Sequence, residues 1–87
     1  GHANDLDVED QVLNTDARYI GVIGSRHKVS ATDAQLMERG HTKEQLRRAV
    51  SPIGLDIGGE TPEEIAISIA AQMIAVRSGK LEARRAL

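Results

Sequence analysis

The sequence contains no cysteine, tryptophan or phenylalanine, and Tyr19 is its single aromatic residue. Without cysteine, the chain cannot form a disulfide, bind a metal through thiolates or use a cysteine nucleophile. With one aromatic side chain, it lacks the stacking platforms on which single-stranded nucleic acid binds. Its apolar residues are therefore almost all aliphatic, and its function must rest on other chemistry.

A strong excess of charge and a long apolar run are missing as well. The formal net charge of −2 and a pI near 5.9 disfavour binding to nucleic acid or to an acidic membrane surface. No apolar run approaches the ~18 residues of a membrane-spanning helix. At 87 residues the chain provides one domain at most. We therefore expect a cytoplasmic protein with no nucleic-acid partner and no membrane partner.

What the sequence does contain is glycine at two junctions between an apolar segment and a helix, of which YIGVIGSRHK is the first. Residues Tyr19–Ile23 are apolar without alternation, which is typical of a strand buried on both faces. A helix is expected over Arg26–Arg39, with Ala34 and Met37 facing inward and Gly40 ending it. The start of a helix after a glycine turn offers free backbone N–H groups to an anion.

Four residues at this junction are candidates for binding a phosphate. Gly24 permits close approach of the backbone, and Ser25 offers a hydroxyl. Arg26 could bind the phosphate bidentately, and Lys28 would act as a point charge. The alternative is a structural turn in which Ser25 caps the helix and both cations are solvated. The residues alone leave the two interpretations open.

The second junction lies in PIGLDIGGETPEEIAISI, which starts at Pro52. Thr61 can cap a helix, and Glu64, three residues later, completes a capping box. The expected helix, Pro62–Ser78, carries apolar side chains around most of its circumference and must be buried in a core or an interface. The loop before it supplies the second set of candidates, which could cradle part of a ligand or merely satisfy turn geometry: Gly54, Asp56, Gly58 and Gly59.

The remaining segments predict little further sheet. The opening residues predict a short helix with Val8, Val12 and Leu13 facing inward. A Thr42–Gln45 capping box predicts a second short helix that runs to about Val50. Only Ile53–Ile57 has the character of a second, weak strand. Because a strand buried on both faces needs strand neighbours, the chain looks like a portion of an α/β sheet.

The segments YIGVIGSRHK and PIGLDIGGETPEEIAISIAAQMIAVR resemble the C-terminal Rossmann-like domain of the xanthine dehydrogenase accessory proteins, the XdhC/CoxI family. The resemblance implies an α/β fold over residues 1–79, the C-terminal part of a Rossmann-like domain with few parallel strands flanked by helices. Residues 80–87 would form a helical extension or a frayed tail. The family's N-terminal domain and its first Rossmann half have no counterpart here, so we expect a fragment of a longer protein or a naturally short relative.

The resemblance also implies a chaperone-type maturation factor without catalytic activity of its own. Members of the family bind the molybdenum cofactor (molybdopterin), protect it during sulfuration and help to insert it into the apo-enzyme. The implied partners are the apo-enzyme of a xanthine dehydrogenase-type molybdenum hydroxylase and a cysteine desulfurase. On this interpretation the cofactor phosphate lies at Gly24–Lys28, and the Gly54–Gly59 loop borders its organic part.

Two other classes of function stay open. One is a fragment of an NAD(P)-binding oxidoreductase, against which stands the absence of a G-x-G-x-x-G turn with an acidic residue ~20 positions later. The other is a protein-interaction domain that docks through its apolar helix. The strand Tyr19–Ile23 and the helix Pro62–Ser78 also predict a homo-oligomer, because so short a chain offers too little surface to cover both.

Overall fold

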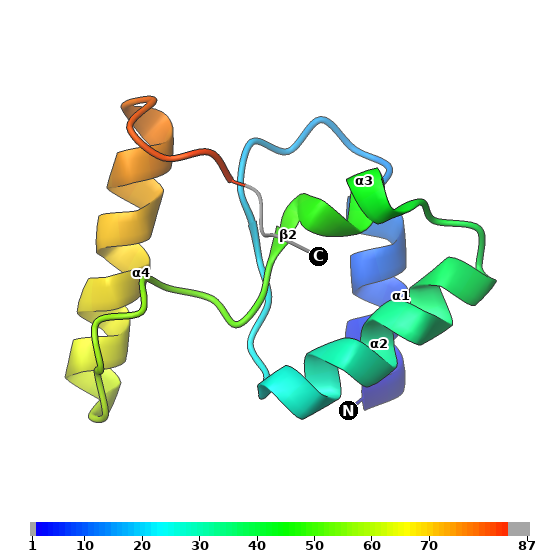
Figure 1. Cartoon of the computed structure of the whole chain (residues 1–87), viewed down its shortest axis with the longest axis horizontal. Coiled ribbons are helices and arrows are strands. Elements are labelled where there is room, and N and C mark those ends of the chain that lie inside the picture. Colours follow the sequence, from blue (N-terminus) through cyan, green and yellow to red (C-terminus); the bar gives the residue numbers. More distant parts are fainter. Residues whose placement is uncertain (1, 84–87) are drawn as a thin grey trace.

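The computed structural model describes residues 2–83, in which four helices accompany two short parallel strands (Figure 1). The strands lie between α4 on one side and the other three helices on the other. In chain order, the elements are α1 (His2–Val12), β1 (Ile20–Gly21), α2 (Arg26–Glu38), α3 (Lys43–Arg47), β2 (Ala49–Val50) and α4 (Pro62–Arg77).

The two strands form a parallel pair in which Ile20 lies opposite Ala49. The ladder continues past the strands, because Val22 N–H donates to the Val50 carbonyl at 2.9 Å and Ile53 N–H donates to the Val22 carbonyl at 3.0 Å. Parallel neighbours need a crossover connection, and here α2 and α3 together provide it. The prediction of an α/β fold with few parallel strands flanked by helices is confirmed.

The predicted position of the second strand was wrong. The helix expected to reach Val50 ends at Arg47, and after Arg48 the residues Ala49 and Val50 pair with β1. After Ile53 the segment leaves the sheet, because its backbone turns towards α4: Gly54 has a φ of 99°, and Leu55 N–H donates to the Ser68 carbonyl at 3.2 Å.

Apart from the carboxyl end of α3, the predicted and observed helix ends agree closely. Capping boxes open α3 at Thr42 and α4 at Thr61, as predicted. Gly40 follows α2, and its N–H donates to the Met37 carbonyl at 3.0 Å. Gly79 follows α4 in the same way, donating to the Val76 carbonyl at 3.1 Å. These local signals need no tertiary partner, which is why they can be recognised in the sequence.

The hydrophobic core lies between the strands and the helices α1, α2 and α3. Its fully or nearly buried apolar residues are Leu13, Ile20, Leu36, Leu46 and Ala49. Three residues predicted to face inward do not: Val8 and Met37 are 60% and 46% exposed, and Ala34 is exposed as well. In α2 the inward position is Leu36, so the predicted helical face was rotated by about one residue.

The strand predicted to be buried on both faces is also only partly so, since Ile23 is 77% exposed. Among the described residues, no helix has the length and apolarity to cross a membrane. After α4, residues 80–83 are not helical, and the rest of the predicted tail, 84–87, lies outside the described residues.

Candidate functional site

A groove of about 800 Å³ opens beside β1 and its carboxyl end, between α1 and α2. Gly24 and Lys28 line it on the α2 side, and Ser51, which follows β2, closes one edge. Ligands of open α/β sheets bind beyond the carboxyl ends of the strands, and small-molecule sites enclose about 300–1,000 Å³. Position and size make this groove the best candidate site among the described residues.

Of the first predicted set of site residues, the structure places only some in the groove. Ser25 is the N-cap of α2, and its hydroxyl accepts a hydrogen bond from Lys28 N–H at 3.2 Å. Arg26 is exposed at the first position of the helix and does not line the groove. Gly24 and Lys28 therefore line the groove, while Ser25 caps the helix start that lies between them.

Packing does not require glycine at position 24. A Cβ built on Gly24 would lie 3.4 Å from Cδ of Lys28, which is an ordinary van der Waals distance. The fold itself therefore tolerates a side chain here, and a small residue is needed only if something else approaches the main chain. A ligand phosphate at the start of α2 fits that description.

The groove also carries acidic side chains that the sequence did not single out. Asp5 and Glu9 of α1 and Asp33 of α2 line it together with Lys28. Nζ of Lys28 lies 3.8 Å from a carboxylate oxygen of Asp5. Asp5 and Glu9 are one helical turn apart and so share a face of α1. This spacing is visible in the sequence, but it points to the groove only once the packing of α1 beside α2 is known. The groove thus presents one cation and several hydrogen-bond acceptors.

The second predicted set lies elsewhere, since Gly54, Asp56, Gly58 and Gly59 do not line the groove. Gly54 packs tightly against α4: a Cβ there would lie 2.5 Å from Oγ of Ser68. A Cβ on Gly59 would lie 3.2 Å from Cβ of Glu64. Asp56 is exposed. The two predicted parts of one site are therefore not brought together in this chain.

The start of α4 is already occupied by a carboxylate of the chain itself. Glu64 accepts hydrogen bonds from the backbone N–H groups of Glu60 at 2.8 Å and Thr61 at 3.1 Å. These two bonds, Glu60 first, lower the pKa of Glu64. A helix start whose N–H groups are used in this way has little left to offer a phosphate. This geometry favours the structural interpretation of the Gly54–Gly59 loop.

A polar joint fixes α4 to the strands. Oε1 of Gln72, which is 6% exposed, accepts from the Tyr19 hydroxyl and from Gly54 N–H, the latter at 2.9 Å. Partial burial raises the pKa of Tyr19. The lone aromatic residue of the chain is thus used for positioning, and the sequence carries no signal that pairs it with Gln72.

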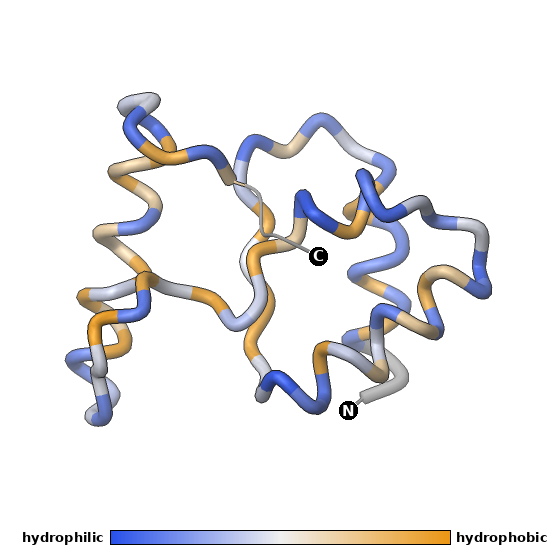
Figure 2. The backbone as a smooth tube through the Cα atoms, in the orientation of Figure 1, coloured by the Kyte–Doolittle hydropathy of each residue, from blue (hydrophilic) through white to orange (hydrophobic). Residues whose placement is uncertain are grey.

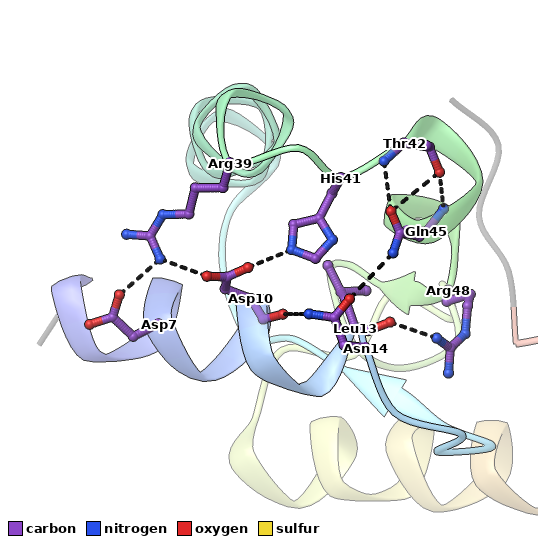
Figure 3. A network of polar contacts seen from close by, with 9 residues as sticks. All are labelled: Asp7, Asp10, Leu13, Asn14, Arg39, His41, Thr42, Gln45 and Arg48. Carbon is purple, nitrogen blue, oxygen red and sulfur yellow. Dashed lines mark hydrogen bonds and ion pairs between the residues drawn. The ribbon is translucent and has the colours of Figure 1, made fainter.

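A network of charged side chains holds α1, one wall of the groove, against the end of α2 (Figure 3). Asp10 lies 2.5 Å from Nε2 of His41 and accepts from Arg39 at 3.0 Å. Arg39 also donates to Asp7 at 2.9 Å. The hydrogen bond to His41 and then that to Arg39 lower the pKa of Asp10. His41 is nearly buried, and the network joins α1 to the end of α2 and to the turn that follows it.

The described residues contain no group of three His, Cys, Asp or Glu side chains arranged to hold an ion. The fold is that of a Rossmann-like α/β domain: parallel strands joined through helices, a glycine turn into a helix, and a ligand-sized groove beside that turn.

The particular family follows from comparison with known proteins. The sequence matches the family of the XdhC Rossmann domain over residues 1–73, and the chain belongs to that family. It is 36% identical over 74 residues to the uncharacterized protein YqeB of Escherichia coli K12. It is 32% identical over 76 residues to a probable subunit of xanthine dehydrogenase from Bacillus subtilis 168. These matches cover 85% and 87% of this chain but only 14% and 21% of the two relatives.

Proposed function

We propose that this chain is the Rossmann-type part of an accessory factor for a xanthine dehydrogenase-type molybdenum hydroxylase, and that its groove contributes to binding the molybdenum cofactor. One observation carries the proposal: in a member of the XdhC family, the ligand-sized groove at the carboxyl end of β1 is bordered by Gly24 and Lys28. The name of the Bacillus subtilis relative supports the link to xanthine dehydrogenase.

The residues of the groove suit the two ends of such a ligand. Its phosphate would be held by Lys28 and by backbone N–H groups at the start of α2, with Gly24 allowing close approach. Arg26, exposed at the first position of α2, adds positive charge beside that start. Asp5 lies on the facing wall and can accept hydrogen bonds from ring N–H groups of a pterin.

The cofactor supplies the redox chemistry of the hydroxylase, whereas the residues of this chain bind, orient and shield it. The chain is therefore a binding protein and not an enzyme in this proposal. The Gly54–Gly59 loop supports α4 and makes no contact with the ligand. The partners are the hydroxylase apo-enzyme in the cytoplasm and a cysteine desulfurase, which fits a factor that holds cofactor during sulfuration.

The proposal is tested by titrating the purified chain with molybdopterin and, separately, with NADPH. Lys28→Ala removes a charge-assisted hydrogen bond to the phosphate and should weaken molybdopterin binding by about 1.5–3 kcal/mol. Arg26→Ala removes only a charge beside the groove and should weaken binding by less. Lys43→Ala is the matched control, because Lys43 is exposed on α3 and does not line the groove. Its affinity should equal that of the parent chain.

Other results of the two titrations would favour the other two classes of function, a nucleotide-binding domain or a protein-interaction domain. Saturable binding of NADPH without binding of molybdopterin would identify a nucleotide-binding domain. If neither ligand binds, the chain acts through protein contacts alone. Equal affinities of Lys28→Ala, Arg26→Ala and the parent for molybdopterin would place the cofactor outside the Gly24–Lys28 junction.

A further inference from the structure

Helix α4 turns its polar side inward and leaves apolar residues in water. Its buried residues are Ser68 and Gln72, which lie one turn apart and face the loop at Gly54. By contrast, Ile67, Met73 and Ile74 are 62%, 51% and 54% exposed. Figure 2 shows apolar residues along this helix, which Figure 1 places on the outer side of the strand pair. This surface resembles one half of an interface.

The exposed side of α4 follows a regular spacing. Positions three, four and seven apart share one face of a helix. The residues on this face, called here the α4 seam, are Glu63, Ala66, Ile67, Ala70, Met73, Ile74 and Arg77. All seven are exposed. Ala70 lies at the centre of the seam, with Ile67 and Met73 on either side, Ala66 and Ile74 beyond them, and one charge at each end.

The α4 seam is complementary to itself when it is reversed. Glu63 and Arg77 each lie seven residues from Ala70, in opposite directions. Ile67 and Met73 lie three residues away on either side. In an antiparallel pair of α4 helices that cross at Ala70, Glu63 of each copy therefore meets Arg77 of the other. Neither charge takes part in an ion pair among the described residues.

We propose that two copies of this chain associate through the α4 seam, with antiparallel helices that cross on a two-fold axis at Ala70. The alanines allow the helices to approach to the close end of the usual 8–10 Å range. Ile67, Met73 and Ile74 are then covered by their counterparts, and the two Glu63–Arg77 pairs fix the antiparallel direction.

The size of the seam limits the strength of this dimer. Helix α4 has 16 residues and is about 24 Å long at 1.5 Å per residue. One helix pair of that length buries less than the ~800 Å² per partner of a standard interface. Self-association in the micromolar range is therefore expected. A groove of about 1000 Å³, lined among the described residues by Arg18, Arg48 and the carboxyl-terminal half of the seam, lies beside the proposed contact.

Charge reversal tests the pairing. Glu63→Lys and Arg77→Glu each place like charges opposite one another twice in a homodimer, and each should raise the dissociation constant by about tenfold or more. An equimolar mixture of the two variants restores both pairs in a heterodimer and should sediment as a dimer again. Glu38→Lys on α2 and Lys43→Glu on α3 make the same charge changes at exposed positions away from α4 and should sediment like the parent. A mixture that stays monomeric would overturn the proposal, as would a monomeric parent chain at tens of micromolar.

Cross-linking tests the crossing point without disturbing the charges. The chain has no cysteine, so Ala70→Cys introduces a single thiol. Two such residues on the two-fold axis should oxidise to an intermolecular disulfide in high yield. Ala34→Cys is the control, because Ala34 is an exposed alanine within α2 and lies off the seam. Equal yields for the two variants would show that Ala70 is not at a two-fold contact and would contradict the proposal.

Discussion

Gly54→Ala should destabilise the fold much more than Gly58→Ala, although both positions belong to one loop and both have positive φ. The φ angles are 99° at Gly54 and 75° at Gly58. An L-residue in this left-handed region costs about 1–2 kcal/mol. That cost applies to both variants, so a comparison of the two isolates what packing adds.

Packing adds a cost only at Gly54. The new Cβ there would lie 2.5 Å from Oγ of Ser68 and 3.5 Å from Cγ1 of Ile69, whereas nothing lies within 4 Å of a Cβ on Gly58. Overpacking of this kind costs about 1–3 kcal/mol. Displacement of the loop would also disturb the bond from Gly54 N–H to Gln72. We expect losses of about 2–5 kcal/mol for Gly54→Ala and about 1–2 kcal/mol for Gly58→Ala.

The two losses can be compared by urea unfolding followed by circular dichroism at 222 nm. Small domains have about 5–15 kcal/mol in total, so the loss at Gly54 should shift the midpoint markedly. The Gly58 variant supplies the matched control for the backbone conformation. Equal midpoints for the two variants would refute the claim that the loop is packed against α4 at Gly54.

Three further predictions concern the joints around the groove and the α4 seam. Tyr19→Phe removes a hydroxyl donor to Gln72 and should cost about 0.5–1.5 kcal/mol in urea unfolding; an unchanged midpoint would show that this bond does not hold α4. Because hydrogen bonds from His41 and Arg39 lower the pKa of Asp10 in the folded state, their stabilisation is present above the unfolded pKa near 3.9 and is lost as the pH falls through the folded value. Asp10→Asn should therefore destabilise the chain at pH 7, and the stability of this variant should fall less than that of the parent below about pH 4. Urea midpoints of the parent and the variant, measured at pH 7 and below pH 4, would contradict this prediction if both proteins lose the same stability on acidification. Glu63→Lys and Arg77→Glu should each dissociate the dimer and should reassociate when mixed, as followed by sedimentation.

The sequence predicted the elements whose signals are local. The capping boxes at Thr42 and Thr61 and the glycine after α2 depend on hydrogen bonds within a few residues, and all are present. Strand β2 carries no such signal, because Ala49–Val50 is too short to show a period. It becomes a strand only because it pairs with the edge of β1, and that contact depends on the tertiary structure. The inward face of α2 was misplaced because Leu36 and Met37 are neighbours of nearly equal apolarity.

Only the residues on the α2 side of the candidate site could be predicted from the sequence. Gly24 and Lys28 follow from the strand-to-helix turn, and both line the groove. Asp5 and Glu9 were missed because nothing in the sequence says that α1 packs beside that turn. The Asp10–His41 and Arg39–Asp7 contacts that position α1 join residues about thirty positions apart. Such pairs arise from the fold and cannot be read from spacing.

The central claim, that the cofactor binds at the start of α2 and not at the start of α4, is tested most directly by amide hydrogen exchange with and without molybdopterin. We predict slower exchange on ligand addition for residues 20–33, which include β1, Gly24 and the first half of α2. Residues 54–64 should exchange at the same rate with and without ligand, because Glu64 already occupies the start of α4. Protection confined to residues 54–64, or no protection in 20–33, would contradict the account.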